Sequence, residues 1–234
     1  MPDWLPDAAA AVLCAIIAIT FHEAAHGYAA RALGDPTAAI LGRVSLNPLR
    51  HVDPVGTLLV PALLLGSQLL ATGRVEFMFG WAKPVPVDVR NFANPRVGMM
   101  WVAIAGPVMN FALALLAGLA IHGVSAAEPF LSADSASWLY RALGLFILVN
   151  LVLGLFNLFP VPPLDGGRIL VGLLPFRAAM AVARIEPAGL FLVIGVLFLL
   201  PMAIPAFQPM DWFVQQIVRP AFGFVLHATG HPFP

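Results

Sequence analysis

The stretch that decides the fold covers residues 8–36 and reads AAAAVLCAIIAITFHEAAHGYAARALGDP. It follows Asp7, which can cap a helix, and it ends in a glycine and a proline, which stop one. About 26 helical residues at about 1.5 Å each give a helix of about 39 Å, longer than the roughly 30 Å hydrocarbon core of a bilayer. The residues before it contain Asp3 and Asp7 but no Lys or Arg, unlike a cleaved signal peptide. We therefore predict a retained membrane-spanning helix.

The composition extends this prediction to the whole chain. Of its 234 residues, 60% are hydrophobic and only 10% are charged, whereas soluble proteins contain about 25% charged residues. The net charge of zero gives no support to nucleic-acid binding. We expect a polytopic α-helical membrane protein that forms a single domain over residues 1–234, with a core at about 8–175 and accessory helices at about 176–234. Further apolar segments cover residues 55–71, 98–123, 138–159, 188–205 and 212–227.

The first helix carries the motif His22-Glu23-Ala24-Ala25-His26. Residues four apart lie about 40° apart around a helix, so both imidazoles can bind one cation, and Glu23 then lies beside that cation as a potential general base. Ionisable residues at bilayer depth indicate function. The structural alternative is a pair of histidines packed in a polar helix seam, but random placement would give this pattern in only roughly three sequences per thousand.

A zinc ion held by two histidines needs a third protein ligand. Asp165 is the best candidate, because it lies in the sequence NLFPVPPLDGGR of residues 157–168, directly after an apolar segment. Three prolines and two glycines prevent a regular helix there, and unwound backbone at membrane depth is tolerated where it lines an enclosed or wet cavity. The alternative is an ordinary interfacial loop in which Asp165 caps the next helix.

Together these motifs resemble the site-2 proteases, the intramembrane zinc metalloproteases of peptidase family M50, in a minimal form without PDZ or CBS domains. Residues 21–27 match the family's HExxH motif, residues 157–167 match its NxxPxPxLDGG motif, and residues 106–110 (GPVMN) resemble its GxxxN element. The resemblance implies one zinc ion per chain, bound by His22, His26 and Asp165, with Glu23 as general base. It implies supporting or oxyanion-binding roles for Asn157 and Asn110. His51, in the family-like segment 47–54, is a weaker candidate for the same site.

Membrane topology provides an independent test. His26 and Asp165 can share a metal only if residues 55–71 do not cross the membrane, so this segment, with Pro61 and Gly66 inside it, is expected to be re-entrant or tilted within one leaflet. Most Lys and Arg residues then fall on one side, which marks the cytoplasmic face. We therefore expect a cell-membrane protein with its N-terminus outside and its active site in the cytoplasmic half.

Residues 39–46 and 79–87 read as two short strands of a membrane-associated β element. A helical substrate must unwind before hydrolysis, and a strand edge near the metal could receive its freed backbone. The candidate edge comprises Trp81, Lys83, Val85 and Val87. The expected function is hydrolysis of peptide bonds in other transmembrane proteins. The alternatives are a metal transporter or sensor with the same ligands, or a catalytically silent scaffold, and the oligomeric state stays open.

Overall fold

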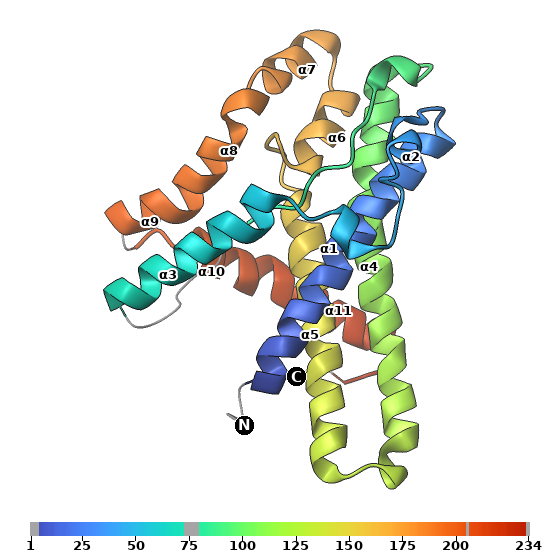
Figure 1. Cartoon of the computed structure of the whole chain (residues 1–234), viewed down its shortest axis with the longest axis vertical. Helices are drawn as coiled ribbons and strands as arrows, with labels where there is room; N and C mark the ends of the chain where they lie inside the picture. The colour runs from blue at the N-terminus through green and yellow to red at the C-terminus, as the bar shows by residue number, and fades with distance from the viewer. Residues whose placement is uncertain (1–4, 73–79, 205, 233–234) are drawn as a thin grey trace.

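In a computed structural model that describes residues 5–72, 80–204 and 206–232, all the regular elements are helices (Figure 1). The β element expected from the sequence is therefore wrong for the described residues. Residues 39–46 include the end of a short helix, α2 (Thr37–Ile40), and a turn in which Gly42 has a φ of 64°. Residues 80–88 form no ladder, and two of them, Pro84 and Pro86, have no N–H to contribute to one.

Three long helices form the centre of the molecule: α1 (Leu5–Ala32), α4 (Pro95–Ala127) and α5 (Ala133–Asn157). α4 packs against α1, α5 and the short helix α6 (Asp165–Leu173). A buried apolar cluster joins α4 and α5 to the C-terminal helices, with Ile147 fully buried in it. Each helix begins before the apolar segment predicted for it; α4 contains all of residues 98–123, whereas α5 ends two residues before the end of the predicted segment 138–159.

The helix ends that carry the histidine and aspartate motifs lie in the same part of the bundle. The C-terminal half of α1, the N-terminal half of α4, the C-terminal end of α5 and the start of α6 all lie in the upper half of Figure 1. The α4–α5 connection, with the 3₁₀ turn η4 (Glu128–Phe130), lies at the opposite end. The histidine motif of α1 and Asp165 at the start of α6 therefore lie at the same level of the bundle.

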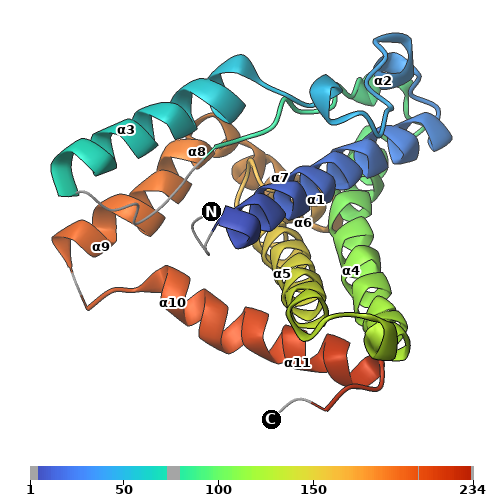
Figure 2. The ribbon, with the colours of Figure 1, turned by 60° about the horizontal axis from the view of Figure 1, so that its bottom comes forward.

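The segment expected to be re-entrant forms one helix, with a π-helical start, η2 (Pro54–Leu59), that continues as α3 (Val60–Thr72). After α3 the chain comes back to the start of this helix, because the N–H of Trp81 donates to the carbonyl of Gly56 at 3.1 Å. α3 projects from the bundle on the same side as α8 (Figure 2). Trp81, which follows α3 in the chain, therefore lies beside Gly56, which precedes α3. The chain after α3 does not continue to the opposite end of the bundle.

Within the described residues, four helices are long and apolar enough to cross a membrane, at Pro6–Ala32, Pro95–Phe130, Ala133–Asn157 and Glu186–Ala203. The prediction of a multi-pass membrane protein is confirmed by the length and apolar composition of these helices. Residues 212–227 lie outside these four spans. The accessory part comprises α7 (Phe176–Ala183), α8 (Glu186–Ile194), η5 (Gly195–Leu199), α9 (Leu200–Ala203), α10 (Pro209–Phe213), η6 (Val214–Val218) and α11 (Arg219–Ala228).

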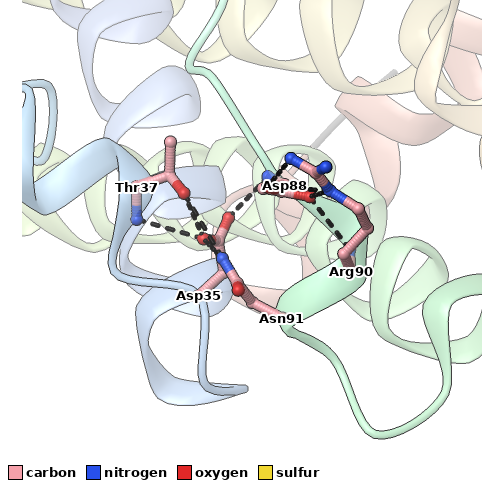
Figure 3. Close-up of polar contacts among 5 residues, drawn as sticks. All are labelled: Asp35, Thr37, Asp88, Arg90 and Asn91. Carbon is pink, nitrogen blue, oxygen red and sulfur yellow. Dashed lines mark hydrogen bonds and ion pairs between the residues drawn. The ribbon is translucent and has the colours of Figure 1, made fainter.

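A polar cluster ties the end of α1 to the chain that leads into α4 (Figure 3). The buried carboxylate of Asp35 accepts hydrogen bonds from the N–H of Thr37 (3.0 Å), the N–H of Asp88 (2.8 Å) and the amide of Asn91 (2.7 Å). Burial would raise the pKa of Asp35, but the hydrogen bonds from Thr37, Asn91 and Asp88 together hold it below its ordinary value. Two 3₁₀ turns complete this region, η1 (Pro48–Arg50) and η3 (Val89–Asn91).

Candidate metal centre

The two histidines of the motif lie one turn apart on α1, and their ring centroids are 4.7 Å apart. The side chain of His22 is 6% exposed and that of His26 is 12% exposed. Both are therefore almost completely removed from solvent, where an uncompensated polar group is costly. Their spacing of four residues places both imidazoles on one face of α1, where His22 contacts Asn110 and His26 contacts the carbonyl of Val102, both on α4.

Asp165 reaches the histidines from the first residue of α6. Its Oδ2 atom lies 3.1 Å from Nε2 of His22 and 3.4 Å from Nε2 of His26. The loop before it folds tightly, with a cis Pro162-Pro163 peptide bond. A Cβ on Gly166 would overlap the carbonyl oxygens of residues 158 and 159, so only glycine fits there. The two glycines after Asp165 thus let the loop pack closely enough to bring its carboxylate to α1.

Hydrogen bonds on the far side of each ring determine which nitrogen faces Asp165. Nδ1 of His26 lies 2.7 Å from the carbonyl oxygen of Val102, which only accepts, so this nitrogen carries the proton. Nδ1 of His22 lies 2.6 Å from Oδ1 of Asn110. The orientation of this amide follows from its other side, because its nitrogen donates to Oδ1 of Asn150 at 2.9 Å and to the carbonyl of Ala18 at 3.3 Å.

The consequence is that Nε2 of each histidine presents a lone pair toward the site. Asp165 Oδ2 is buried and has no hydrogen-bond partner among the described residues. Ligand atoms of the three residues lie within 4.8 Å of one another. Three acceptors facing each other in a buried space repel unless a cation lies between them, and two imidazoles with a carboxylate form a donor set that suits zinc. The site therefore fits a metal ion.

Gly106 on α4 makes room for this arrangement. A Cβ at this position would lie 2.5 Å from Cε1 of His26 and 2.6 Å from Nε2 of His22. Four residues later on the same helix, Asn110 supports His22. The GxxxN element therefore has two physical uses, close approach of α4 to the imidazoles and orientation of one of them.

Glu23 lines the same cavity of about 300 Å³ as the three metal-site residues. Its Oε2 accepts a hydrogen bond from the N–H of Val85 at 3.1 Å. Residues Trp81, Ala82, Pro84, Val85 and Val87 form one wall of the cavity, and Asn157 lines it as well. The chain thus places a carboxylate beside the metal centre and fixes one of its oxygens with a backbone donor.

The extended segment 80–88 differs from the expected strand edge. The N–H groups of Trp81, Lys83 and Val85 donate to Gly56, His51 and Glu23, respectively. These three donors are therefore engaged by the chain itself. In the part of the chain that the structure describes, the N–H groups of Ala82 and Val87 have no hydrogen-bond partner.

The other candidate residues are placed as follows. Asn157 donates one N–H to the carbonyl of Leu153 at 3.0 Å and keeps its side chain at the cavity wall. His51 is buried, its Nε2 lies 2.8 Å from the Ser45 carbonyl, and it lines a neighbouring cavity of about 480 Å³ that does not include the metal-site residues.

Two supporting residues escaped the sequence analysis. Asn150 is fully buried on α5, where it fixes the amide of Asn110, and Arg43 is buried beside the extended segment. An asparagine inside an apolar span is a signal that could have found the first, because polar side chains in such helices usually bond across helices. No comparable signal pointed to Arg43.

These features define the class of the protein as a multi-pass membrane protein with a buried His-His-Asp group that could hold a metal ion. The pattern described as Peptidase family M50 matches residues 122–201, which include Asp165. YwhC of Bacillus subtilis is 39% identical over 199 residues, covering 85% of this chain and 84% of YwhC. Rip2 of Mycobacterium tuberculosis is 28% identical over 186 residues, covering 80% of this chain and 65% of Rip2. Both carry the name "Putative zinc metalloprotease".

The chain therefore belongs to peptidase family M50, as the motifs predicted, and is a zinc metalloprotease of the site-2 protease type. No solved structure matches it.

Proposed function

We propose that the protein is a zinc-dependent endopeptidase that hydrolyses peptide bonds within or near the transmembrane segments of other membrane proteins. One observation carries the proposal. Three potential metal-ligand atoms and the carboxylate of Glu23 converge on a single cavity, and the described part of the chain has four helices of membrane-spanning length. Family membership supports the peptidase chemistry, and the position of His22 and His26 inside the candidate span Pro6–Ala32 supports substrates that are themselves in the membrane.

In this proposal His22, His26 and Asp165 hold one zinc ion. Bound zinc supplies a Lewis acid that polarises the scissile carbonyl and makes a water molecule more acidic. Glu23 takes the proton from the attacking water and returns it to the leaving amine. The Val85 N–H orients one oxygen of Glu23, and none of the described residues donates a hydrogen bond to the other, which is the oxygen proposed to carry the proton. Asn157, at the wall of the same cavity, has a second amide N–H with which to bind the developing oxyanion.

The membrane orientation follows from charge. We propose a cell-membrane protein with an outer N-terminus and a catalytic centre in the cytoplasmic half. Water would reach this centre along residues 158–164, the non-helical segment between α5 and α6; the glycines of residues 166 and 167, expected from the sequence to be unwound, lie inside α6. Arg141 would lie on the outer side, and Arg219 is not assigned. The cytoplasmic side would carry Arg31, Arg43, Arg50, Arg74, Lys83, Arg90, Arg96, Arg168, Arg177 and Arg184.

The extended segment remains the proposed receiver of an unwound substrate, although with different donors from those first expected. Because Trp81, Lys83 and Val85 use their N–H groups within the chain, the substrate backbone would pair on the opposite side of the segment, with the N–H group of Ala82 and the carbonyls that face the same way. Helix-breaking residues near the scissile bond of a substrate are then expected to speed cleavage. Val85→Pro is expected to slow cleavage by removing the hydrogen bond to Glu23.

Two other functions use the same residues. A transporter or sensor would bind the metal without hydrolysis, but it has no need of Glu23 beside the ligands, and a silent scaffold has no need of the metal ligands. The test is incubation of purified protein in lipid with a single-span model peptide, with and without zinc. Zinc-dependent cleavage supports the proteolytic function. Zinc binding without cleavage of any membrane peptide would favour a transporter or sensor.

A further inference from the structure

Arg43 is a buried cation that the proposed mechanism leaves unexplained. It follows α2, and only 8% of its surface is exposed. Among the described residues no carboxylate lies within ion-pair distance of its guanidinium, and its Nε atom is buried without a hydrogen-bond partner. Burial lowers the pKa of Arg43, while the negative charge of Glu23 acts in the opposite direction. Burying a guanidinium costs desolvation free energy, which its hydrogen bonds must offset.

Those contacts are made with the extended wall of the catalytic cavity. Nη2 of Arg43 donates to the carbonyl of Lys83 at 2.6 Å and to the carbonyl of Pro84 at 3.3 Å. Successive carbonyls of an extended chain point to opposite sides. One nitrogen that reaches both therefore selects a particular backbone conformation at this point, and the fixed φ of Pro84 restricts it further.

The residue that follows this fixed point is Val85, whose N–H donates to Oε2 of Glu23. Packing supports the same arrangement. A Cβ on Gly27 would lie 3.1 Å from a methyl of Val44 and 3.4 Å from a methyl of Val85. The residues that follow Arg43 and Pro84 thus pack together on α1, one turn beyond Glu23.

We propose that Arg43 is a positioning residue for catalysis: by holding the Lys83 and Pro84 carbonyls, it aims the Val85 N–H at Glu23 and keeps the general base in its working orientation. This inference rests on the proposed proteolytic function. Arg43 is not a metal ligand, so its loss is expected to leave the metal centre intact. Its effect should appear in kcat, because it acts on the base, with a smaller effect on KM.

The test compares Arg43→Ala, Arg43→Gln and Arg43→Lys with the matched control Arg31→Gln, which removes an exposed arginine at the end of α1. Zinc content and size-exclusion profile report the fold and the metal centre. We expect wild-type zinc content throughout, a fall in kcat of at least about tenfold in Arg43→Ala and Arg43→Gln with KM within about threefold, and partial recovery in Arg43→Lys. Arg31→Gln should stay within about twofold of wild type.

A second readout is independent of catalysis. Deuterium uptake by a peptide covering residues 81–88 should be faster in the Arg43 variants than in wild type, in metal-free as well as zinc-loaded protein. Should the wild type cleave no substrate, the proposed function fails, but this exchange experiment still tests the positioning. Wild-type kcat or unchanged exchange in a folded Arg43→Ala or Arg43→Gln protein would overturn the inference.

Discussion

Oδ1 of Asn110 lies 2.6 Å from Nδ1 of His22, and this contact turns the other ring nitrogen toward Asp165. Replacing Asn110 by Leu removes the partner that fixes the tautomer. We expect zinc affinity to fall about 10–100-fold, the range found for hydrogen-bond partners of metal-bound histidines. Competition with a chelator measures this affinity. Val108→Ala, at a 55% exposed position of the same helix, is the control, and an unchanged affinity in Asn110→Leu would contradict the assigned role.

Gly106→Ala should damage the metal centre through its shape alone. The added methyl would lie 2.5–2.6 Å from both imidazoles, so at least one ring must move. We expect lower zinc content with little loss of helical structure. Gly123→Ala on the same helix adds the same group where nothing lies within 4 Å. That control should keep its zinc, and equal zinc content in the two variants would show that close packing at Gly106 is unimportant.

His22→Ala and Asp165→Asn are expected to reduce zinc content and proteolysis together, because each removes a proposed ligand. Metal analysis of the purified variants, alongside cleavage of a membrane peptide, measures both effects. Full zinc occupancy in Asp165→Asn would mean that another residue is the third ligand. His51 is then the residue to test next, even though it lines a different cavity.

Asp35 should stabilise the fold in a pH-dependent way. Its pKa in the folded protein is lowered, so its charged form contributes stability above its ordinary pKa of about 3.9, and this contribution is lost as the pH falls through the folded value. Asp35→Ala leaves buried donors unpaired and should lower the free energy of unfolding at pH 7 by about 1–3 kcal/mol.

Thermal unfolding in detergent at pH 7 and pH 3 measures this contribution. The difference in unfolding temperature between wild type and Asp35→Ala should be smaller at pH 3 than at pH 7. Asp134→Asn, at an exposed position, is the control and should show little effect. A difference in unfolding temperature that stays constant or grows toward pH 3 would contradict the stabilising role of the Asp35 carboxylate.

The helices and the metal group could be predicted because strong local signals encode them. Apolar length defines the spans, and the spacing of His22 and His26 places them on one face whatever the rest of the chain does. Asp165 can meet His22 and His26 only if residues 55–71 do not cross the membrane, and this requirement predicted the course of that segment. The return of the chain from Trp81 to Gly56 agrees with that requirement.

The β element failed as a prediction because its signal was weak. Residues 80–88 are extended, as their valines and prolines suggest, but the hydrogen bonds of Trp81 and Lys83 go to a π-helical turn and a loop instead of a partner strand. Extended conformation is local, whereas pairing depends on tertiary contacts that one sequence does not display. The same reason hid Arg43, whose partners are backbone carbonyls 40 and 41 residues away.

The most direct test of the account measures zinc content and peptide cleavage in the same preparations of wild type and Glu23→Gln. Glu23 lines the cavity beside the metal group but is not a member of it. We expect Glu23→Gln to bind zinc as wild type does and to lose at least about 10²-fold in cleavage rate, because the substitution removes the base and retains the ligands. Cleavage by zinc-loaded Glu23→Gln within about tenfold of wild type would contradict the assignment of Glu23 as general base.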